Sequence, residues 1–508
     1  MNVCNYQTKP YITSLLKNKV REYRLFDTKK LFIYRLFITN IFKLCRQFVT
    51  NIYLCIKYIC RNNMIERLII KELRLWKERG NRKPLILRGA RQVGKTTLVK
   101  EFSKEYDIFL KLNLEIEEDR FLFEQYDKIG DLLKAIYLVN QQKVEELPTL
   151  LFIDEIQNSS KAVAMLRYFY EEANQIHVIA AGSLLENLLN TQKISFPVGR
   201  VEYMAMRPCS FIEFLNGLGE KFDAGLIPSI QVTAVHERVM RLFNSYTLVG
   251  GMPAAVVQYA LNRDILSVST IYESLLESYK DDAEKYAQND TSAKVIRHIL
   301  ETGWGYAAET ISFEKFGGST YRSREMGSAF RTLEKALLVE LVYPSSETRL
   351  PILPDYRKKP KIIWLDTGLV NYVAKIQEEV FSVSNIQDVW RGRIAEHIVA
   401  QELLTLDSRI SVTRNYWRRN KDGSEAEVDF IFPYKGKIIP IEIKSGHNAH
   451  LRSLHLFMEQ APHNIAIRVW SHPLSVDIVN TPQGKEFKLI NLPFYYIGVL
   501  ENVLEKYL

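Results

Sequence analysis

Short apolar runs alternate with stretches of helical spacing over residues 64–226. Three runs suit buried strands and are too short for helices, at residues 85–87, 149–153 and 176–181. Apolar residues at helical spacing follow the first run directly, in residues 97–102. Strands that alternate with helices are typical of a parallel sheet with helices on both faces. The pattern therefore predicts an α/β core, closed by a strand and a short helix in residues 203–215.

The pattern becomes mostly helical in residues 227–345. The run Val249-Gly-Gly-Met-Pro253 interrupts it, and such a cluster predicts a sharp corner between two helices. From residue 291 the predicted order is helix, helix, helix, strand, with the second helix at residues 312–316 and the third at residues 323–335. This is the order of a helix-turn-helix unit. We therefore expect a helical lid followed by a winged-helix-like region.

The third predicted helix region carries three arginines, spaced so that some could face a phosphate backbone: Arg322, Arg324 and Arg331. Glu325 and Glu334 dilute this positive charge. A contact with another protein, or a role as a lid, is therefore at least as well supported as contact with DNA.

Residues 346–508 combine helical and strand-like patterns again. A helix is predicted from Trp390 onward, and two strands are predicted at residues 425–432 and 438–445. The turn Lys435-Gly-Lys437 between them predicts a hairpin. We expect a C-terminal α/β domain.

The chain has 508 residues, of which 47% are hydrophobic and 25% charged, as in globular proteins with several domains. Its formal net charge of +9 does not indicate a nucleic-acid partner for the whole chain. Residues 1–63 hold 12 lysines and arginines but only two acids, which leaves 56 basic and 57 acidic residues in the remainder. Beyond residue 63 the chain is therefore neutral, and its isoelectric point says nothing about partners.

Residues 1–63 form a basic, apolar extension that contains four of the five cysteines. Basic residues interrupt each apolar stretch before it reaches the roughly 18 residues of a membrane span, at Arg35, Lys43, Arg46 and Lys57. A basic amphipathic surface helix is one interpretation. We prefer a translation start at Met64, with the extension an upstream artefact or a disordered tail. Only Cys209 would then remain, as expected in a reducing cytoplasm.

Residues 89–96 read Gly-Ala-Arg-Gln-Val-Gly-Lys-Thr and lie between a predicted strand and a predicted helix. This spacing of glycines, lysine and a hydroxyl residue fits the phosphate-loop pattern. Such a loop turns its backbone N–H groups toward a polyphosphate at a helix N-terminus. Lys95 would reach the β and γ phosphates, and the Thr96 hydroxyl would bind Mg²⁺. The sequence thus predicts a nucleoside triphosphate site formed by Gly89, Ala90, Arg91, Gln92, Val93, Gly94, Lys95, Thr96 and Thr97.

Two acids end the apolar strand at residues 149–153. Asp154 would support the Mg²⁺ ion, and Glu155 would orient or deprotonate the attacking water. The pair follows the loop by about 60 residues, and a parallel sheet would bring it beside the phosphates. The alternative is two solvated acids at a strand end. The position favours a functional pair, and hence hydrolysis of the nucleotide.

Two further polar residues are candidates for the same site. Ser183 follows the strand at residues 176–181, where AAA-type ATPases carry a polar sensor near the γ-phosphate. Ordinary loop chemistry explains Gly182-Ser183 equally well. Arg200 lies where such proteins often place an arginine that reaches a neighbouring subunit's nucleotide, although it could be an ordinary surface residue.

A second set of polar residues lies in the C-terminal domain. Asp429 lies on the first hairpin strand, and Glu442 and Lys444 share one face of the second. Glu396, on the preceding helix, could join them. Carboxylates suit Mg²⁺, and a nearby lysine could position water for phosphodiester cleavage. A domain kept only for binding, or an exposed strand with a salt bridge, is the alternative.

These motifs together resemble a large bacterial and archaeal ATPase family that joins an AAA-type core to a C-terminal domain of unknown function. The similarity rests on the phosphate loop, on Leu-Phe-Ile-Asp-Glu-Ile-Gln157 and on the two C-terminal strands. It spans roughly residues 64–447 and includes residues 364–369. The set Glu396, Asp429, Glu442 and Lys444 resembles the PD-(D/E)XK nuclease fold. The family resemblance implies ATP rather than GTP and a cytoplasmic location. It implies no substrate.

The predicted organisation is an extension (1–63), an AAA-type P-loop core (64–226), a helical and winged-helix region (227–345) and a nuclease-like α/β domain (346–508). We expect slow ATP hydrolysis with Mg²⁺, coupled to the C-terminal half. One alternative is an ATP-gated nuclease acting on DNA. Another is a switch that does not hydrolyse ATP and docks a protein or DNA partner. Self-assembly is also compatible with the sequence, and a membrane span is not expected.

Overall fold

The computed structural model of the protein describes residues 65–182, 197, 199–287, 289–379, 388–419, 426–444 and 451–508. The chain divides into two units, residues 1–64 and residues 65–508. The expectations for residues 1–63, and for a start at Met64, lie outside the described residues.

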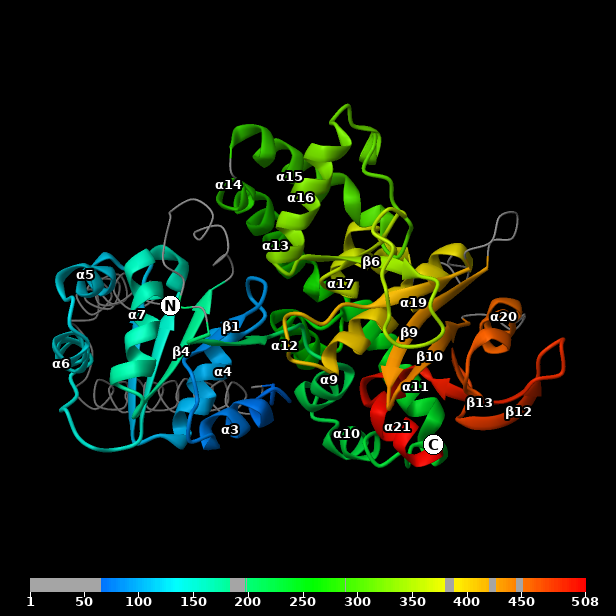
Figure 1. Cartoon of the computed structure of the whole chain (residues 1–508), viewed down its shortest axis with the longest axis horizontal. Helices are drawn as coiled ribbons and strands as arrows, with labels where there is room; N and C mark the ends of the chain where they lie inside the picture. The colour runs from blue at the N-terminus through cyan, green and yellow to red at the C-terminus, as the bar shows by residue number, and fades with distance from the viewer. Residues whose placement is uncertain are drawn as a thin grey trace, which may run out of the picture. The chain divides into compact units, whose positions relative to one another are not determined.

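A five-stranded sheet forms the centre of the first part of the larger unit (Figure 1). Its strands lie in the order β2 (Ile108–Asn113), β3 (Thr149–Asp154), β4 (Ile176–Gly182), β1 (Leu85–Arg88) and β5 (Glu202–Ala205). Each neighbouring pair is parallel. The predicted parallel α/β core is therefore confirmed.

Successive residues of β1 pack on opposite faces of this sheet. Leu85 and Leu87 belong to a core cluster that includes residues of α3 (Ile70–Glu78) and α4 (Lys95–Phe102). Ile86 belongs to a second cluster with α5 (Glu117–Gln125), α6 (Ile129–Val139) and α7 (Ser160–Glu172). Because side chains alternate along a strand, an all-apolar run such as Leu-Ile-Leu requires helices on both sides.

Helices follow the sheet: α9 (Phe211–Gly217), α10 (Lys221–Leu226), α11 (His236–Val249), α12 (Pro253–Asn262), α13 (Ser269–Asp281), α14 (Ala283–Tyr286), α15 (Asp290–Thr302) and α16 (Ser323–Lys335). The predicted corner between α11 and α12 is confirmed. It requires glycine, because a Cβ atom on Gly250 would lie 2.2 Å from Oδ1 of Asp366. A buried carboxylate thus packs directly against the corner.

The helix predicted at residues 312–316 is wrong. This segment forms turns, followed by the short 3₁₀ helix η6 (Phe316–Gly318). Lys315 and Gly317 both adopt left-handed backbone conformations, with φ of 55° and 60°. A right-handed helix cannot continue through such residues, so only two α-helices, α15 and α16, precede the next strand in this part of the described chain.

An eight-stranded mixed sheet forms the C-terminal part (Figure 1). Its order is β12 (Ser475–Asn480), β13 (Glu486–Pro493), β11 (Ile465–Trp470), β10 (Lys437–Ile443), β9 (Glu427–Tyr434), β8 (Asn415–Arg418), β6 (Val339–Ser345) and β7 (Lys361–Trp364). The predicted hairpin is confirmed as the antiparallel pair β9–β10. Because β6 belongs to this sheet, the sheet crosses the boundary predicted at residue 345.

The two faces of the C-terminal sheet are covered by different helices. Ile398 and Val399 of α19 (Asp388–Thr405) lie in the core cluster that contains Phe430 of β9. Ile431, the next residue on β9, lies in the cluster of α20 (Arg452–Gln460). Shorter helices complete this part: α17 (Thr367–Val373), α18 (Ile376–Glu379) and α21 (Leu500–Tyr507). In the described ranges, no helix combines the length and the apolar character needed to span a bilayer.

Candidate functional site

The loop between β1 and α4 depends on its two glycines. Gly94 has a φ of 96° and directly precedes the first helical residue, Lys95. A Cβ atom on Gly89 would lie 2.6 Å from the carbonyl oxygen of Met206, so a side chain has no room there. The glycines thus allow the left-handed turn and the close backbone approach that let N–H groups gather at the start of α4.

Lys95 is buried inside this loop, with 8% of its surface exposed. Its ammonium group donates hydrogen bonds to the carbonyl oxygens of Gly89 (2.8 Å) and Ala90 (3.0 Å). Burial lowers the pKa of Lys95, and Arg91 lowers it further, while Glu155 and Asp154 act in the opposite direction. The loop therefore surrounds a cation that an anionic ligand would stabilise.

Thr96 and Asp154 lie together, as the sequence predicts. The Thr96 hydroxyl donates a 2.8 Å hydrogen bond to Oδ2 of Asp154, the last residue of β3. One strand, β4, lies between β1 and β3, and all three run in the same direction. The loop after β1 and the acid at the end of β3 consequently meet at one edge of the sheet. A hydroxyl and a carboxylate side by side fit the oxygen ligands that Mg²⁺ prefers.

Glu155 follows in a left-handed conformation, with a φ of 52°. The side-chain amide of Gln157 donates a hydrogen bond of 2.5 Å to its Oε2. Gln157 in turn packs against the end of β4, because a Cβ atom on Gly182 would lie 2.3 Å from its Oε1. The sequence motif contains Gln157 but predicts no role for it. Its two-residue separation from a candidate acid was the available signal.

The remaining two candidates for this site are Ser183 and Arg200. Ser183 lies outside the described residues. Arg200 forms an ion pair with Glu171 of α7 at 2.9 Å, and its side chain is 43% exposed. The structure thus places Arg200 on the surface of this chain, paired within it.

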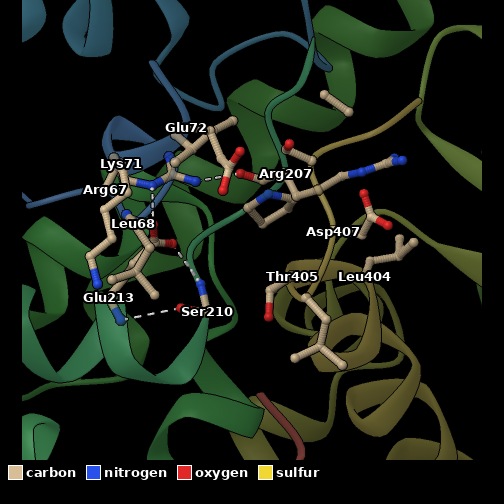
Figure 2. Close-up of a pocket in the computed structure, with 15 residues that line it drawn as sticks. Arg67, Leu68, Lys71, Glu72, Arg207, Ser210, Glu213, Leu404, Thr405 and Asp407 are labelled. Atoms are coloured by element: carbon tan, nitrogen blue, oxygen red, sulfur yellow. Dashed lines mark hydrogen bonds and ion pairs between the residues drawn. The ribbon is translucent and has the colours of Figure 1, made fainter. Parts of the chain in front are cut away.

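Arg67 supports the loop from outside and was not predicted. Its guanidinium donates to the carbonyl oxygens of Val93 (2.8 Å) and Arg207 (2.5 Å), and it lies 3.1 Å from a carboxylate oxygen of Glu213. Figure 2 shows Arg67 beside Glu213 in the wall of a pocket of about 230 Å³, with Thr405 and Asp407 on another wall. None of residues 89–97 is among the described residues that line this pocket. It is therefore separate from the phosphate loop.

The loop also contacts helices that come much later in the chain. The Arg91 guanidinium pairs with Asp282, which follows α13, at 3.1 Å, and the Tyr279 hydroxyl donates to the Arg91 carbonyl oxygen at 3.3 Å. Arg88, directly before Gly89, donates to the carbonyl oxygen of Lys335 at the end of α16 at 2.5 Å. These contacts connect the loop to the helical region.

The predicted C-terminal residues form one cluster, together with two residues that were not predicted. The ammonium group of Lys361 lies 2.5 Å from Glu396 and 2.6 Å from Glu427. Lys444 pairs with Glu442 at 2.8 Å. Asp429 Oδ2 accepts a 2.7 Å hydrogen bond from the backbone N–H of Ile443. Lys361 was missed because it comes from β7, more than sixty residues before the hairpin. Glu427 was missed although it lies on the predicted strand, two residues before Asp429.

Burial dominates the electrostatics of this cluster. It raises the pKa of Glu396 to about 8, with Lys361 acting in the opposite direction and Asp429 adding to the rise. It raises the pKa of Glu442 to about 8 as well, and Asp429 again adds to the rise. The carboxyl groups therefore lie close enough to disfavour one another's ionised forms.

Comparison with family models agrees with the geometry of the first site. Residues 81–215 match the model of an AAA domain. This part of the chain is similar to AAA domains. With its parallel sheet and phosphate loop it has the P-loop NTPase fold. Residues 240–380 and 391–494 match two domains of unknown function, DUF8612 and DUF4143. The family models thus give the C-terminal part no nuclease assignment.

Solved structures with detectable similarity are distant from this chain. A Walker-type ATPase of Pyrococcus abyssi is 14% identical, with 61% of this chain and 96% of that chain covered and a TM-score of 0.40. The ORC2 protein of Aeropyrum pernix, in ADPNP–ADP complexes, is 13% identical, with 63% and 96% covered and a TM-score of 0.33. The RuvB Holliday junction branch migration motor of Thermotoga maritima is 17% identical, with 57% and 91% covered and a TM-score of 0.26. A search of curated proteins gave no match.

Proposed function

We propose that the protein is a Mg²⁺-dependent ATP hydrolase whose nucleotide state is transmitted to its C-terminal half. The observation that supports the proposal most directly is the hydrogen bond between Thr96 and Asp154, beside a loop that contains the buried Lys95. These residues come from two different strand ends. A fold that served only packing would not need a cation, a hydroxyl and a carboxylate at one point.

Each residue has a distinct role in this proposal. Lys95 binds the β and γ phosphates in place of the two carbonyl oxygens that it now contacts. Thr96 and Asp154 hold the Mg²⁺ ion, which neutralises charge on the phosphate oxygens when it is bound. Glu155 orients the attacking water, and Gln157 holds the Glu155 carboxylate in position. Arg200 and Ser183 remain candidates for a subunit-bridging arginine and a sensor.

The proposed transmission runs through the residues next to the loop. Arg91 lies within the phosphate loop and pairs with Asp282, a residue with only 5% of its surface exposed. Arg88 is bonded to the end of α16. A nucleotide that shifts the loop by a fraction of an ångström would alter both contacts, because close-packed contacts of this kind do not deform continuously.

The alternative, a switch that does not hydrolyse ATP, differs from the hydrolase in phosphate release by the wild-type protein. Lys95→Ala should abolish binding of a fluorescent ATP analogue and abolish phosphate release, since it removes the cation from the loop. Both readouts should be measured on the full chain with Mg²⁺. A wild-type protein that binds the analogue tightly but releases no phosphate would support the switch and contradict the hydrolase. A wild-type protein that does not bind ATP would contradict both.

A second candidate function is the docking of duplex DNA on α16. Four exposed residues lie on one side of this helix, at intervals of four, three and four residues: Arg324, Ser328, Arg331 and Lys335. The two acids of this helix, Glu325 and Glu334, each accept a hydrogen bond from a backbone N–H group. Glu325 accepts from the Arg322 N–H at 3.0 Å, and Glu334 accepts from the Leu341 N–H at 2.8 Å. Neither acid belongs to this row of four exposed residues, three of which are basic.

We also expect a cytoplasmic protein that uses cellular ATP. Cys209 is buried and unpaired, as is usual in a reducing compartment.

A further inference from the structure

The C-terminal polar cluster contains a cation of its own. We use the term acidic cluster for Glu396, Glu427, Asp429 and Glu442. Lys361 reaches this cluster from β7 and is 4% exposed. Its ammonium group contacts Glu396 of α19 and Glu427 of β9 at 2.5 and 2.6 Å, and lies 4.9 Å from the centre of the Tyr416 ring. The side chain is thus held on three elements at once.

The sequence predicts a divalent metal ion at this position. The arrangement of the carboxylates shows whether they could serve as its ligands. A metal ion of this kind requires several carboxylate oxygens that converge on one point. Within the described ranges, no group of three or more His, Cys, Asp and Glu side chains is arranged to hold a metal ion. Each carboxylate of the acidic cluster is instead directed at another partner. Glu396 and Glu427 face Lys361, Glu442 faces Lys444, and Asp429 accepts from a backbone N–H.

We propose that Lys361 is a built-in cation that takes the place of the predicted divalent metal, so that the acidic cluster of the C-terminal domain holds no metal ion. The ammonium group supplies positive charge where a nuclease of the predicted kind needs Mg²⁺. A lysine cannot perform the Lewis-acid chemistry of a metal ion, because it has no open coordination position for water or a phosphate oxygen. The proposal is independent of ATP hydrolysis by the AAA domain.

Charge balance explains why the lysine stays protonated in a buried place. Burial alone lowers the pKa of a lysine, but Glu396, Glu427 and Asp429 together raise the pKa of Lys361 above its ordinary value. A buried ion pair of this kind is costly to break from one side, because the remaining charge is left without a partner. Removal of the lysine would leave a group of buried carboxylates. Such a group would then attract a cation from solution.

The test is a titration of the nucleotide-free full chain with Mn²⁺, a cation that suits carboxylate ligands and is visible by electron paramagnetic resonance. Every protein in the series also carries Asp154→Asn, so that the AAA domain contributes no metal carboxylate. We expect no Mn²⁺ site in this parent protein and one new site per chain in Lys361→Met. The new site should disappear when Asp429→Asn is added. Lys361→Arg keeps the positive charge and should gain no site.

Two results would overturn the proposal. A Mn²⁺ site in the parent protein that is lost in Asp429→Asn or Glu442→Gln would show that the cluster holds a metal beside the lysine. A folded Lys361→Met protein without a new site would show that Lys361 does not stand in for a metal. Folding is checked by circular dichroism. If Lys361→Met is unfolded, the comparison of the parent with its Asp429→Asn variant still decides, because a shared absence of the site supports the proposal.

Metal-dependent cleavage provides a second readout of the same question. Wild-type protein should leave plasmid DNA and single-stranded RNA intact with Mg²⁺ or Mn²⁺. Cleavage by the wild type that is lost in Lys444→Ala would favour the nuclease and contradict the proposal.

Discussion

Single side chains at the phosphate loop illustrate how a buried cation can be accommodated with different partners. The Lys95 ammonium is satisfied by two backbone carbonyl oxygens of its own loop. A buried charge without a partner would cost several kcal/mol (about 3–5 for a broken buried pair). The carbonyl contacts avoid this cost before a ligand arrives, and charged phosphate oxygens are stronger acceptors than neutral carbonyl groups. Binding would therefore exchange weaker partners for stronger ones.

Glu155 is the residue whose replacement best separates binding from hydrolysis. Glu155→Gln removes the carboxylate that orients water but keeps a side chain of equal size, so ATP binding should persist. General base catalysis commonly contributes about 10²–10⁴-fold, and we expect a loss of hydrolysis of at least about 10²-fold. Filter binding of radiolabelled ATP should show intact nucleotide retained on the variant, while single-turnover assays should show little product.

Glu118→Gln is a matched control for this change. Glu118 is an exposed acid on α5, so its replacement makes the same chemical change outside the phosphate loop. It should hydrolyse ATP at the wild-type rate. Unchanged hydrolysis in Glu155→Gln would remove Glu155 from the mechanism, whatever its position next to Asp154.

At the scale of elements, α16 joins an exposed basic face to the phosphate loop. Arg324 and Arg331 lie on that face, and the carbonyl oxygen of Lys335 at the end of the helix accepts from Arg88. A rigid helix bonded at one end can carry a displacement along its whole length. Contact of the basic face with a phosphate backbone would therefore be felt next to Gly89.

Charge reversal on this face tests the DNA candidate. Arg324→Glu combined with Arg331→Glu should weaken binding of a duplex oligonucleotide by at least about tenfold and flatten its salt dependence, because each lost phosphate contact reduces counterion release. Fluorescence anisotropy at several salt concentrations measures both effects. Any stimulation of ATP hydrolysis by DNA should be lost in the same variant.

Lys128→Glu combined with Lys143→Glu applies an equal change of charge to exposed residues of the AAA domain. It should bind DNA as the wild type does. Equal weakening by both pairs would indicate a general charge effect and would contradict a binding role for α16. Absence of DNA binding by the wild type would leave α16 as a lid or a protein contact.

Elements that depend on local pattern were predictable from the sequence. The strand of Leu85 and Leu87, the phosphate loop and the β9–β10 hairpin follow from hydrophobic periods and from turn residues. The helix expected at residues 312–316 failed because its apolar spacing carries no information about the left-handed conformation of Lys315. Backbone handedness at a non-glycine residue is determined by its surroundings.

At the scale of the whole molecule, several contacts that support the sites were not predictable. Arg67 reaches Val93, Arg91 reaches Asp282, and Lys361 reaches Glu427. Each pair joins residues far apart in the sequence, and no local period records their proximity. Lys95 and Lys444 could be named from the sequence, whereas the cations Arg67 and Lys361 required the packed structure.

Buried acids at the junction of several helices should make the stability of the larger unit depend on pH. Glu402 of α19 is 1% exposed and accepts hydrogen bonds from the Tyr246 hydroxyl of α11 (2.7 Å) and the Phe211 N–H of α9 (3.0 Å). Burial raises the pKa of Glu402 to about 7, although these two hydrogen bonds lower it in part, and Glu213 adds to the rise. Asp366 beside Gly251 is a similar case, with burial raising its pKa to about 6.

The sign of the pH effect follows from where the proton is held. The folded protein keeps the Glu402 proton up to about pH 7, whereas an unfolded chain releases it near pH 4, the ordinary value of about 4.3 for glutamate. Between these limits the unfolded state binds fewer protons, so the free energy of unfolding falls as pH rises. Glu402→Gln removes this loss and keeps an acceptor for Tyr246 and Phe211. The free energy of unfolding of this variant, taken relative to that of the wild type, should therefore increase by on the order of 2 kcal/mol from pH 5 to pH 8.

Urea unfolding at pH 5 and pH 8, followed by tryptophan fluorescence, measures this relative gain. Glu505→Gln, on the exposed side of α21, is the matched control and should show the same difference from the wild type at both pH values. A Glu402→Gln protein whose difference from the wild type does not change with pH would show that Glu402 is ionised in the folded state. In that case the junction would hold a buried negative charge, and Arg67, which pairs with the neighbouring Glu213, would be the first cation to examine as its partner.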